Sequence, residues 1–183
     1  MRHFGVDRGR GIAIFPIFAV GNWEIYAMRM SRKCDYALRA LIYMGMRERD
    51  GYFSIGEIAR EEEIPLRYLE QIFIALKNAG MLSAKSGPSG GYRFRKAPRD
   101  ISLIDVVRLI DGPVAPARCV SRTAYEKCPR ERVCALRPVL SEVRDAIAEI
   151  LDSITLEDVC RKAARARRGR KAQRARASAA SRI

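Results

Sequence analysis

Three of the five cysteines lie close together in the chain and could bind a soft metal or change redox state. Cys119, Cys128 and Cys134 are separated by eight and by five residues. Structural zinc sites typically use two pairs of closely spaced cysteines, and this stretch contains no such pair. An iron–sulfur cluster is wider than a single ion and prefers thiolate ligands, so it suits the looser spacing. The spacing leaves three alternatives open: a cluster, a zinc ion, and unligated or redox-active thiols.

A second set of residues, which follows Pro65, has the pattern of a helix that reads DNA. Leu69, Ile72, Phe73 and Leu76 repeat with helical spacing, and polar side chains lie off their face. Among the polar side chains, Arg67 could pair with guanine, Glu70 with cytosine and Gln71 with adenine. Tyr68 and Lys77 suit the DNA backbone. The alternative is an ordinary solvated helix face.

The elements around this helix predict a winged helix-turn-helix. A preceding helix begins at Ser54, where Glu57 completes a capping box, and Gly80 provides a left-handed stop after the polar-faced helix. Strands are expected at 81–85 and 92–95 around a Gly/Pro-rich tip, with Tyr92 and Phe94 inward and Arg93 and Arg95 outward. Such a hairpin is a wing, whose candidate DNA contacts are Lys85, Ser86 and Arg93. The fold class is therefore mainly α with a small β-hairpin wing.

Further helices are expected on both sides of this unit. One covers 31–47 with Ser31 as its N-cap, and another follows Ser102 to Asp111. The second should bury Leu103, Val106, Val107 and Ile110. A long helix from Leu136 carries an apolar stripe at heptad-like spacing, which fits a dimerisation helix or internal core. Thr155 and Asp158 form the expected cap of a short last helix.

The positive charge is concentrated at the C-terminal end. The formal net charge is +14, and residues 161–183 hold ten Arg and Lys and no acidic residue. Such charge suggests a polyanionic partner, either nucleic acid or an acidic membrane surface. We expect this tail to be disordered, and it either contacts DNA phosphates or is simply solvated.

The chain divides into five segments on these grounds. They are an N-terminal extension (1–27), the winged helix-turn-helix (28–111), a cysteine-bearing loop (112–135), the dimerisation helix with the short terminal helix (136–160), and the basic tail (161–183). The apolar run at 12–20 is too short to cross a membrane and is interrupted by Pro16. A translation start placed too early, with Met28 as the first residue, is an alternative origin of the extension. The odd number of cysteines and the lack of a convincing leader favour a reducing cytoplasm.

The chain resembles the Rrf-type winged-helix regulators, which include the IscR, NsrR and RirA proteins. The resemblance rests on MRMSRKCDYALRAL at 28–41, IGEIAREEEIPLRYLEQIFIALKNAGML at 55–82 and SGPSGGYRF at 86–94. ISLIDVVRLIDGP at 101–113 and LDSITLEDV at 151–159 extend it over the whole expected folded part. It implies a homodimer that binds a pseudo-palindromic double-stranded operator.

The resemblance also implies a cofactor held by the cysteine loop. Cluster-binding relatives place three cysteines there, which implies a 2Fe–2S or 4Fe–4S cluster on Cys119, Cys128 and Cys134. Some relatives add a histidine three residues after the last cysteine, where this chain has Arg137, which cannot ligate. Others use an aspartate from the first helix of the partner subunit, and Asp35 matches that position. Otherwise Asp35 is a first-turn carboxylate favoured by the helix dipole.

The wing departs from the family pattern at one position. Relatives usually carry an arginine before the Gly-Pro of the wing, and that arginine enters the minor groove. Here the position is Ser86, and Lys85 is the candidate replacement.

These features together predict a DNA-binding transcriptional regulator, a repressor. Its operator affinity would be controlled by an iron–sulfur cluster that senses iron, redox state or nitric oxide. A cluster-free thiol switch with the same fold is the alternative. The folded part has no phosphate-binding glycine loop, nucleophile elbow or histidine, so neither an enzyme nor a small-molecule substrate is expected.

Overall fold

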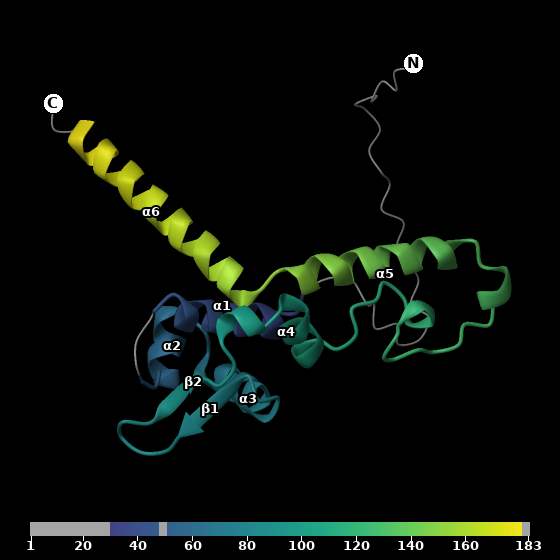
Figure 1. Cartoon of the computed structure of the whole chain (residues 1–183), viewed down its shortest axis with the longest axis horizontal. Coiled ribbons are helices and arrows are strands. Elements are labelled where there is room, and N and C mark those ends of the chain that lie inside the picture. The colour runs from purple at the N-terminus through teal and green to yellow at the C-terminus, as the bar shows by residue number, and fades with distance from the viewer. Residues whose placement is uncertain (1–29, 48–50, 181–183) are drawn as a thin grey trace, which may run out of the picture.

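The computed structural model describes residues 30–47 and 51–180, and shows a small helical head from which two long helices extend (Figure 1). The expected extension at 1–27 lies outside the described residues. The head contains α1 (Arg32–Gly45), α2 (Ile55–Glu61), α3 (Leu66–Asn78) and α4 (Leu103–Ile110). Two antiparallel strands, β1 (Leu82–Lys85) and β2 (Gly91–Phe94), form the wing. The expected class, mainly α with a hairpin wing, is confirmed.

The helices of the head pack around a single apolar core. The stripe of α3 lies at its centre, because Leu69, Ile72, Phe73 and Leu76 are fully buried. Helix α1 contributes Ala37, Ala40, Leu41 and Met44 to the same cluster. Burial of these side chains stabilises the head by about 1.5–3 kcal/mol for each large aliphatic or aromatic residue.

Most of the expected N-cap side chains form hydrogen bonds with the first turn of their helices. The hydroxyl of Ser31 accepts from the amide of Cys34, and Ser102 accepts from Asp105. Ser54 differs from the expected capping box, because its side chain makes no capping hydrogen bond. Glu57 instead accepts a 2.9 Å hydrogen bond from the hydroxyl of Tyr43 on α1. A tertiary contact has thus replaced the local one.

The burial pattern of α4 also departs from the expected one. Val106 and Val107 are buried as expected, but Ile104 is fully buried while Leu103 and Ile110 are only partly covered. The reason is that α4 contacts α1 on one side and α5 on another, so its covered face is turned relative to the predicted stripe.

Two helices of the helix-turn-helix end in the same backbone motif. After α3, Gly80 adopts a φ of 72°, and the amide of Met81 bonds to the carbonyl of Leu76. After α2, Glu63 adopts a φ of 51°, and the amide of Ile64 bonds to the carbonyl of Ala59. These contacts are Schellman-type ends that satisfy helix carbonyls. The second one uses a residue other than glycine and sets the sharp entry into α3.

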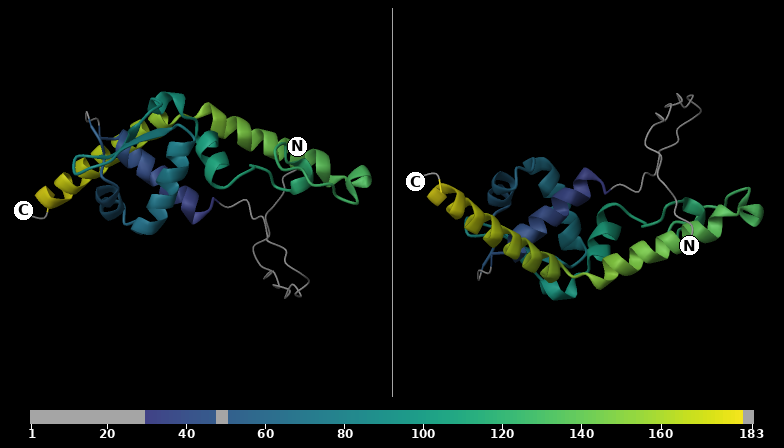
Figure 2. Two further views of the ribbon diagram at one scale, coloured as in Figure 1. Left: turned by 90° about the horizontal axis from the view of Figure 1, so that it is seen from below. Right: turned by 90° about the horizontal axis from the view of Figure 1, so that it is seen from above.

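Two one-turn helices, η2 (Arg118–Val120) and η3 (Glu131–Val133), interrupt the cysteine loop, and η1 (Pro98–Asp100) follows the wing. Helix α5 (Leu136–Ser153) runs away from the head together with this loop, and α6 (Leu156–Ala180) leaves in the opposite direction (Figures 1 and 2). No helix in the described part of the chain is long and apolar enough to span a membrane.

Helix α6 corrects the expectation for the C-terminal end. A short helix followed by a disordered tail was expected, but one helix continues to Ala180. Alanine and arginine are among the strongest helix formers, so this composition propagates a helix that is already nucleated. The nucleus is the first turn, where Leu156 is fully buried and Thr155 and Asp158 form the predicted cap at 2.7–3.2 Å.

Candidate nucleic-acid interface and cysteine loop

Helix α3 presents the polar face that the sequence predicts. Arg67, Tyr68, Glu70, Gln71 and Lys77 are all exposed, while the opposite face of the helix is in the core. The ring of Tyr68 is 54% exposed and rests edge-on against Tyr36 of α1, with 6.3 Å between ring centroids. The arrangement leaves the polar face free to enter a groove without disturbing the core.

The wing carries the other predicted contacts and a residue that the sequence did not reveal. Lys85, Ser86 and Arg93 are exposed. The ring of Tyr52 lies under two of them, 5.0 Å from Arg93 Cζ and 5.9 Å from Lys85 Nζ. A cation above an aromatic face is held by about 0.5–1 kcal/mol at an exposed site. Tyr52 therefore orients both basic side chains at the base of the wing.

A long-range backbone pairing brings Tyr52 to this place. Phe53 and Tyr92 exchange two backbone hydrogen bonds of 2.8 and 2.9 Å, which adds a third short strand segment to the hairpin. Gly91 permits this close approach, because a Cβ there would lie 2.3 Å from the carbonyl oxygen of Phe53. The pairing joins residues about forty positions apart, so no local pattern predicts it.

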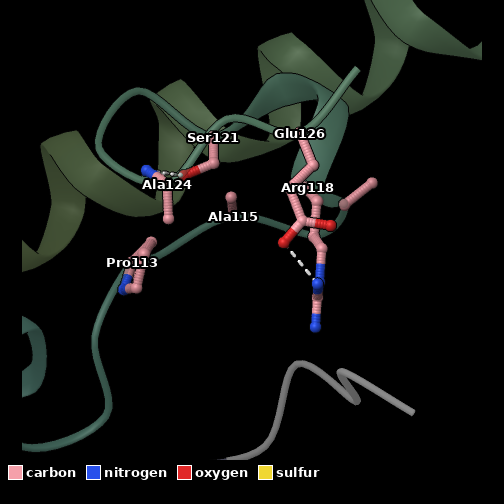
Figure 3. Close-up of a pocket in the computed structure, with 7 residues that line it drawn as sticks. Pro113, Ala115, Arg118, Ser121, Ala124 and Glu126 are labelled. Atoms are coloured by element: carbon pink, nitrogen blue, oxygen red, sulfur yellow. Dashed lines mark hydrogen bonds and ion pairs between the residues drawn. The ribbon is translucent and has the colours of Figure 1, made fainter. Parts of the chain in front are cut away.

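The cysteine loop packs back on α5 through its first half. Val120 and Ser121 are buried, and the guanidinium of Arg144 donates to the carbonyl of Val120. Arg122 pairs with Asp145 at 2.9 Å. A small pocket of about 60 Å³ lies beneath this half, lined by Pro113, Ala115, Arg118, Ser121, Ala124 and Glu126 among others, and no cysteine lines it (Figure 3).

The three predicted ligands are available but are not gathered in the single chain. Cys119, Cys128 and Cys134 are partly exposed, and none is in a disulfide. Within residues 30–47 and 51–180, no group of three His, Cys, Asp or Glu side chains could hold a metal ion. The thiols thus fit the chemistry of a soft-metal cluster, whereas their arrangement is not that of an assembled site.

Polar contacts hold the second half of the loop. Glu131 pairs with Arg137 at 2.8 Å and accepts a 2.5 Å hydrogen bond from the hydroxyl of Tyr125. The hydrogen bond to this carboxylate raises the pKa of Tyr125 above its usual value. Arg137 therefore fastens the segment between Cys128 and Cys134 to the start of α5.

Asp35 lies in the first turn of α1 and is connected to the helix-turn-helix through Arg39. Arg39, one turn later on the same helix, lies 3.7 Å from Asp35 and 3.5 Å from the carboxylate of Glu62. Arg39 also donates to the backbone carbonyl of Glu62, the C-cap residue that follows α2 before the turn into α3. Arg39 therefore links Asp35 to the residue that follows α2.

The cysteine loop is tied to the same end of α1. Asp111, which ends α4 just before the loop, accepts from the amide of Ser31 at 2.9 Å and from its hydroxyl. Ser31 is the N-cap of α1. The residue that precedes the loop is therefore hydrogen-bonded to the start of the helix that carries Asp35 and Arg39.

The remaining two cysteines are packed inside. Cys34 is fully buried, and burial together with the nearby charge of Asp111 raises its pKa to about 12. Cys160 is buried where α6 meets α1, and burial raises the pKa of its thiol as well. Both thiols are therefore held in the neutral form, which is a poor metal ligand.

A family model named Rrf2, described as an iron-dependent transcriptional regulator, matches residues 30–162. An rrf2-like HTH-type transcriptional regulator of Rhodobacter capsulatus is 41% identical over 136 residues, which cover 71% of this chain and 91% of the relative.

Two solved structures show the same fold. CymR, described as the global cysteine regulator of B. subtilis, matches with a TM-score of 0.59 and 30% identity over 73% of this chain and 97% of its own. IscR of T. potens matches with a TM-score of 0.59 and 27% identity, over 74% of this chain and 88% of its own.

Proposed function

Because the chain belongs to the Rrf2 family of DNA-binding transcriptional regulators, which are not enzymes, we propose that it is a homodimeric repressor controlled at its cysteine loop. The observation that carries the proposal is the exposed polar face of α3 beside a basic wing. These two elements lie on one head, whereas the loop lies along α5 (Figure 1). The chain thus separates a DNA-reading part from a part that can sense a signal.

Sequence reading is assigned to three side chains of α3. Arg67, Glu70 and Gln71 are exposed on one polar face and offer donors and acceptors that match base edges in the major groove. Tyr68 and Lys77 flank them and suit phosphate contacts, as do Lys85, Ser86 and Arg93 of the wing.

Helix α5 is assigned to dimerisation. It buries none of its residues in the single chain, although its stripe contains seven large aliphatic side chains. Three large apolar residues on it are more than half exposed, namely Leu136, Val139 and Ile150. The apolar side chains that α4 and the loop leave exposed on this eighteen-residue helix fit a partner helix, and a second copy of α5 supplies one with matching spacing. Two heads related by this contact would meet a pseudo-palindromic operator.

The loop is proposed to hold an iron–sulfur cluster on Cys119, Cys128 and Cys134, with Asp35 of a second copy as a candidate further ligand. When bound, such a cluster would make the loop responsive to iron, oxidants or nitric oxide. The ligands are not gathered in one chain, and a dimer could bring residues of two copies together at one site. The contacts from Asp111 to Ser31 and from Arg39 to Glu62 would carry a change in the loop to α3.

A cluster-free thiol switch is the second candidate. The family includes the iron–sulfur regulator IscR and also CymR, which lacks a cluster. The partly exposed thiols of the loop are compatible with this alternative, because an added oxidant such as a peroxide could convert them to sulfenic acids without a metal.

Operator selection tests the DNA-reading part. The purified full-length protein should enrich a pseudo-palindromic sequence from a random duplex pool. Replacing Arg67 with Ala should weaken binding to that sequence by about 1–3 kcal/mol, or roughly five- to 150-fold, and relax the preference at one base pair. Arg108→Ala on α4 is a matched control, because it removes an exposed arginine outside the predicted reading surface. Equal losses in both variants, or no enriched sequence, would contradict the assignment.

Purification without oxygen separates the two sensing mechanisms. A cluster protein should be coloured, contain iron and sulfide, and lose both in the Cys128→Ala variant but not in the Cys160→Ala control. A colourless, iron-free protein whose operator binding responds to a thiol oxidant would support the thiol switch instead.

A further inference from the structure

Helix α6 carries a dense positive charge beyond the point where it is buried. Residues 161–180 contain nine Lys and Arg side chains and no acidic one. The basic residues are Arg161, Lys162, Arg165, Arg167, Arg168, Arg170, Lys171, Arg174 and Arg176. The backbone of this segment is helical to Ala180, so the basic residues follow one another along a helix.

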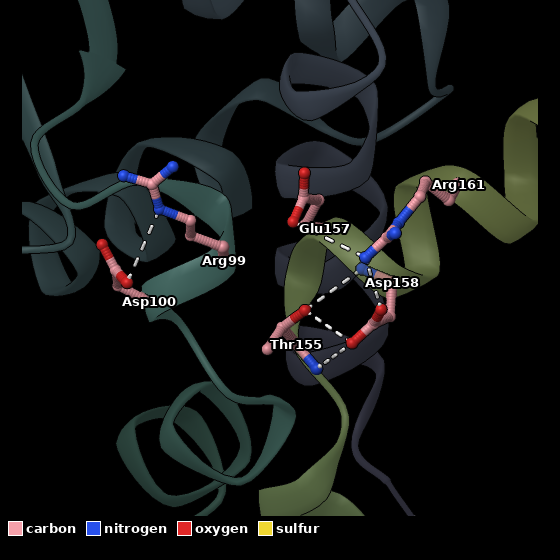
Figure 4. Close-up of polar contacts among 6 residues, drawn as sticks. All are labelled: Arg99, Asp100, Thr155, Glu157, Asp158 and Arg161. Atoms are coloured by element: carbon pink, nitrogen blue, oxygen red, sulfur yellow. Dashed lines mark hydrogen bonds and ion pairs between the residues drawn. The ribbon is translucent and has the colours of Figure 1, made fainter.

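The base of this helix is fixed to the DNA-reading head. Leu156 is fully buried and Cys160 nearly so, and α6 packs against α1 and η1. Arg161 is neutralised there by Asp158 at 2.8 Å and Glu157 at 3.6 Å, next to the Arg99–Asp100 pair of η1 (Figure 4). The start of the charged segment is therefore held at a fixed place on the head.

The charged segment passes beside the helix-turn-helix and not beside the cysteine loop. Nη2 of Arg167 lies 4.0 Å from Oε1 of Glu62, the residue that ends α2 before the turn into α3. In Figure 1, α6 leaves the head on the side opposite β1, β2 and α3, and α5 with the loop extends toward the other end of the molecule.

The charges beyond the base are available to a partner. Lys162, Arg165 and Arg168 are exposed, and none of them pairs with an acidic residue in the described part of the chain. The segment has no large apolar residue, since alanine, glycine, serine and glutamine separate the basic ones. An interfacial membrane helix needs an apolar face, so the composition favours a fully polar partner of high charge density, namely DNA.

We propose that residues 161–180 of α6 are a second DNA-binding element, which contacts phosphates next to the operator without reading sequence. This inference rests on the proposed DNA-binding function. Twenty helical residues extend about 30 Å, which is comparable to about nine base pairs of duplex. The element would raise affinity for long DNA and make binding more salt-dependent.

The test compares two full-length variants that differ only in charge. One replaces Arg165, Arg168, Arg170, Arg174 and Arg176 with Gln, and the matched control replaces the same five residues with Lys. Glutamine and lysine are both good helix formers, and circular dichroism verifies the helix in each. Affinity is measured against NaCl concentration on the selected operator alone and on the operator with about ten flanking base pairs on each side.

The wild type and the Lys control should bind the longer duplex more tightly and with a steeper salt slope. The Gln variant should lose this gain, with a slope shallower by about 0.9 for each phosphate contact removed. An unchanged slope on the longer duplex would overturn the proposal while operator selection by α3 still stood. Loss of binding to phosphatidylglycerol vesicles with an unchanged DNA slope would also overturn it, and would indicate a membrane partner.

Discussion

Gly45 offers a sharp test of how α6 is anchored to the head. It is the last residue of α1, and a Cβ built on it would lie 2.6 Å from Sγ of Cys160 on α6. Replacing Gly45 with Ala would gain up to about 1 kcal/mol of helix propensity. It would also force one methyl group into a filled space, at a cost of about 1–3 kcal/mol. We therefore expect a net loss of roughly 1 kcal/mol in the free energy of unfolding.

A second substitution identifies the cause of this loss. Cys160→Ala removes the sulfur, and its Cβ, 3.9 Å from the added methyl, is at an ordinary contact distance. Alone it should cost about 1 kcal/mol through lost burial. In the double variant the added methyl fills the vacated space, so the two substitutions should couple favourably by about 1–3 kcal/mol.

Urea unfolding followed by circular dichroism at one fixed protomer concentration measures all four proteins, because stability of a dimer depends on concentration. A Gly45→Ala protein as stable as the wild type, together with additive effects in the double variant, would refute this packing of α6 on α1.

Three further predictions follow from single contacts. Tyr52→Ala should weaken operator binding by about 0.5–1 kcal/mol for each basic side chain that it holds, whereas Tyr52→Phe should retain most of the affinity; equal losses in gel-shift titrations would contradict this. Arg39→Ala should loosen the turn before α3, so that operator binding weakens while the melting temperature changes little. A lower melting temperature with unchanged operator affinity would argue against its positioning role. The lowered pKa of Asp158 means that its cap contributes stability above the ordinary carboxyl pKa, a contribution that is lost as pH falls through the lower folded value. In the Asp158→Asn variant, the free energy of unfolding should therefore fall less steeply as the pH is lowered. The same fall in the variant and the wild type would count against the cap.

The DNA-reading part could be predicted from the sequence because its signals are local. The spacing of Leu69, Ile72, Phe73 and Leu76 identifies the buried face of α3, and the glycine at position 80 marks its end. The left-handed residue at the other end of the turn is Glu63, a residue type that gives no such signal. The alternation from Tyr92 to Arg95 likewise gave the faces of the wing.

The contacts that support the site depend on residues far apart in the chain. Glu57 would cap α2 by local rules, but the hydroxyl of Tyr43 competes for its carboxylate. Tyr52 reaches the wing only through the pairing of Phe53 with Tyr92, and Arg39 reaches Glu62 across the head. The tail was expected to be disordered because it lacks an apolar face, yet its helix propensity and its anchored first turn extend α6 to Ala180.

Operator affinity with and without the signal tests the central claim most directly. The anaerobically purified protein is titrated with the selected operator before and after iron removal or oxidation, beside the Cys128→Ala variant and the Cys160→Ala control. We predict that the affinity of the wild type and of the control changes by about 1–3 kcal/mol, or roughly five- to 150-fold, while the Cys128 variant stays in one state. An identical affinity of the wild type under all these conditions would contradict control of DNA binding by the cysteine loop.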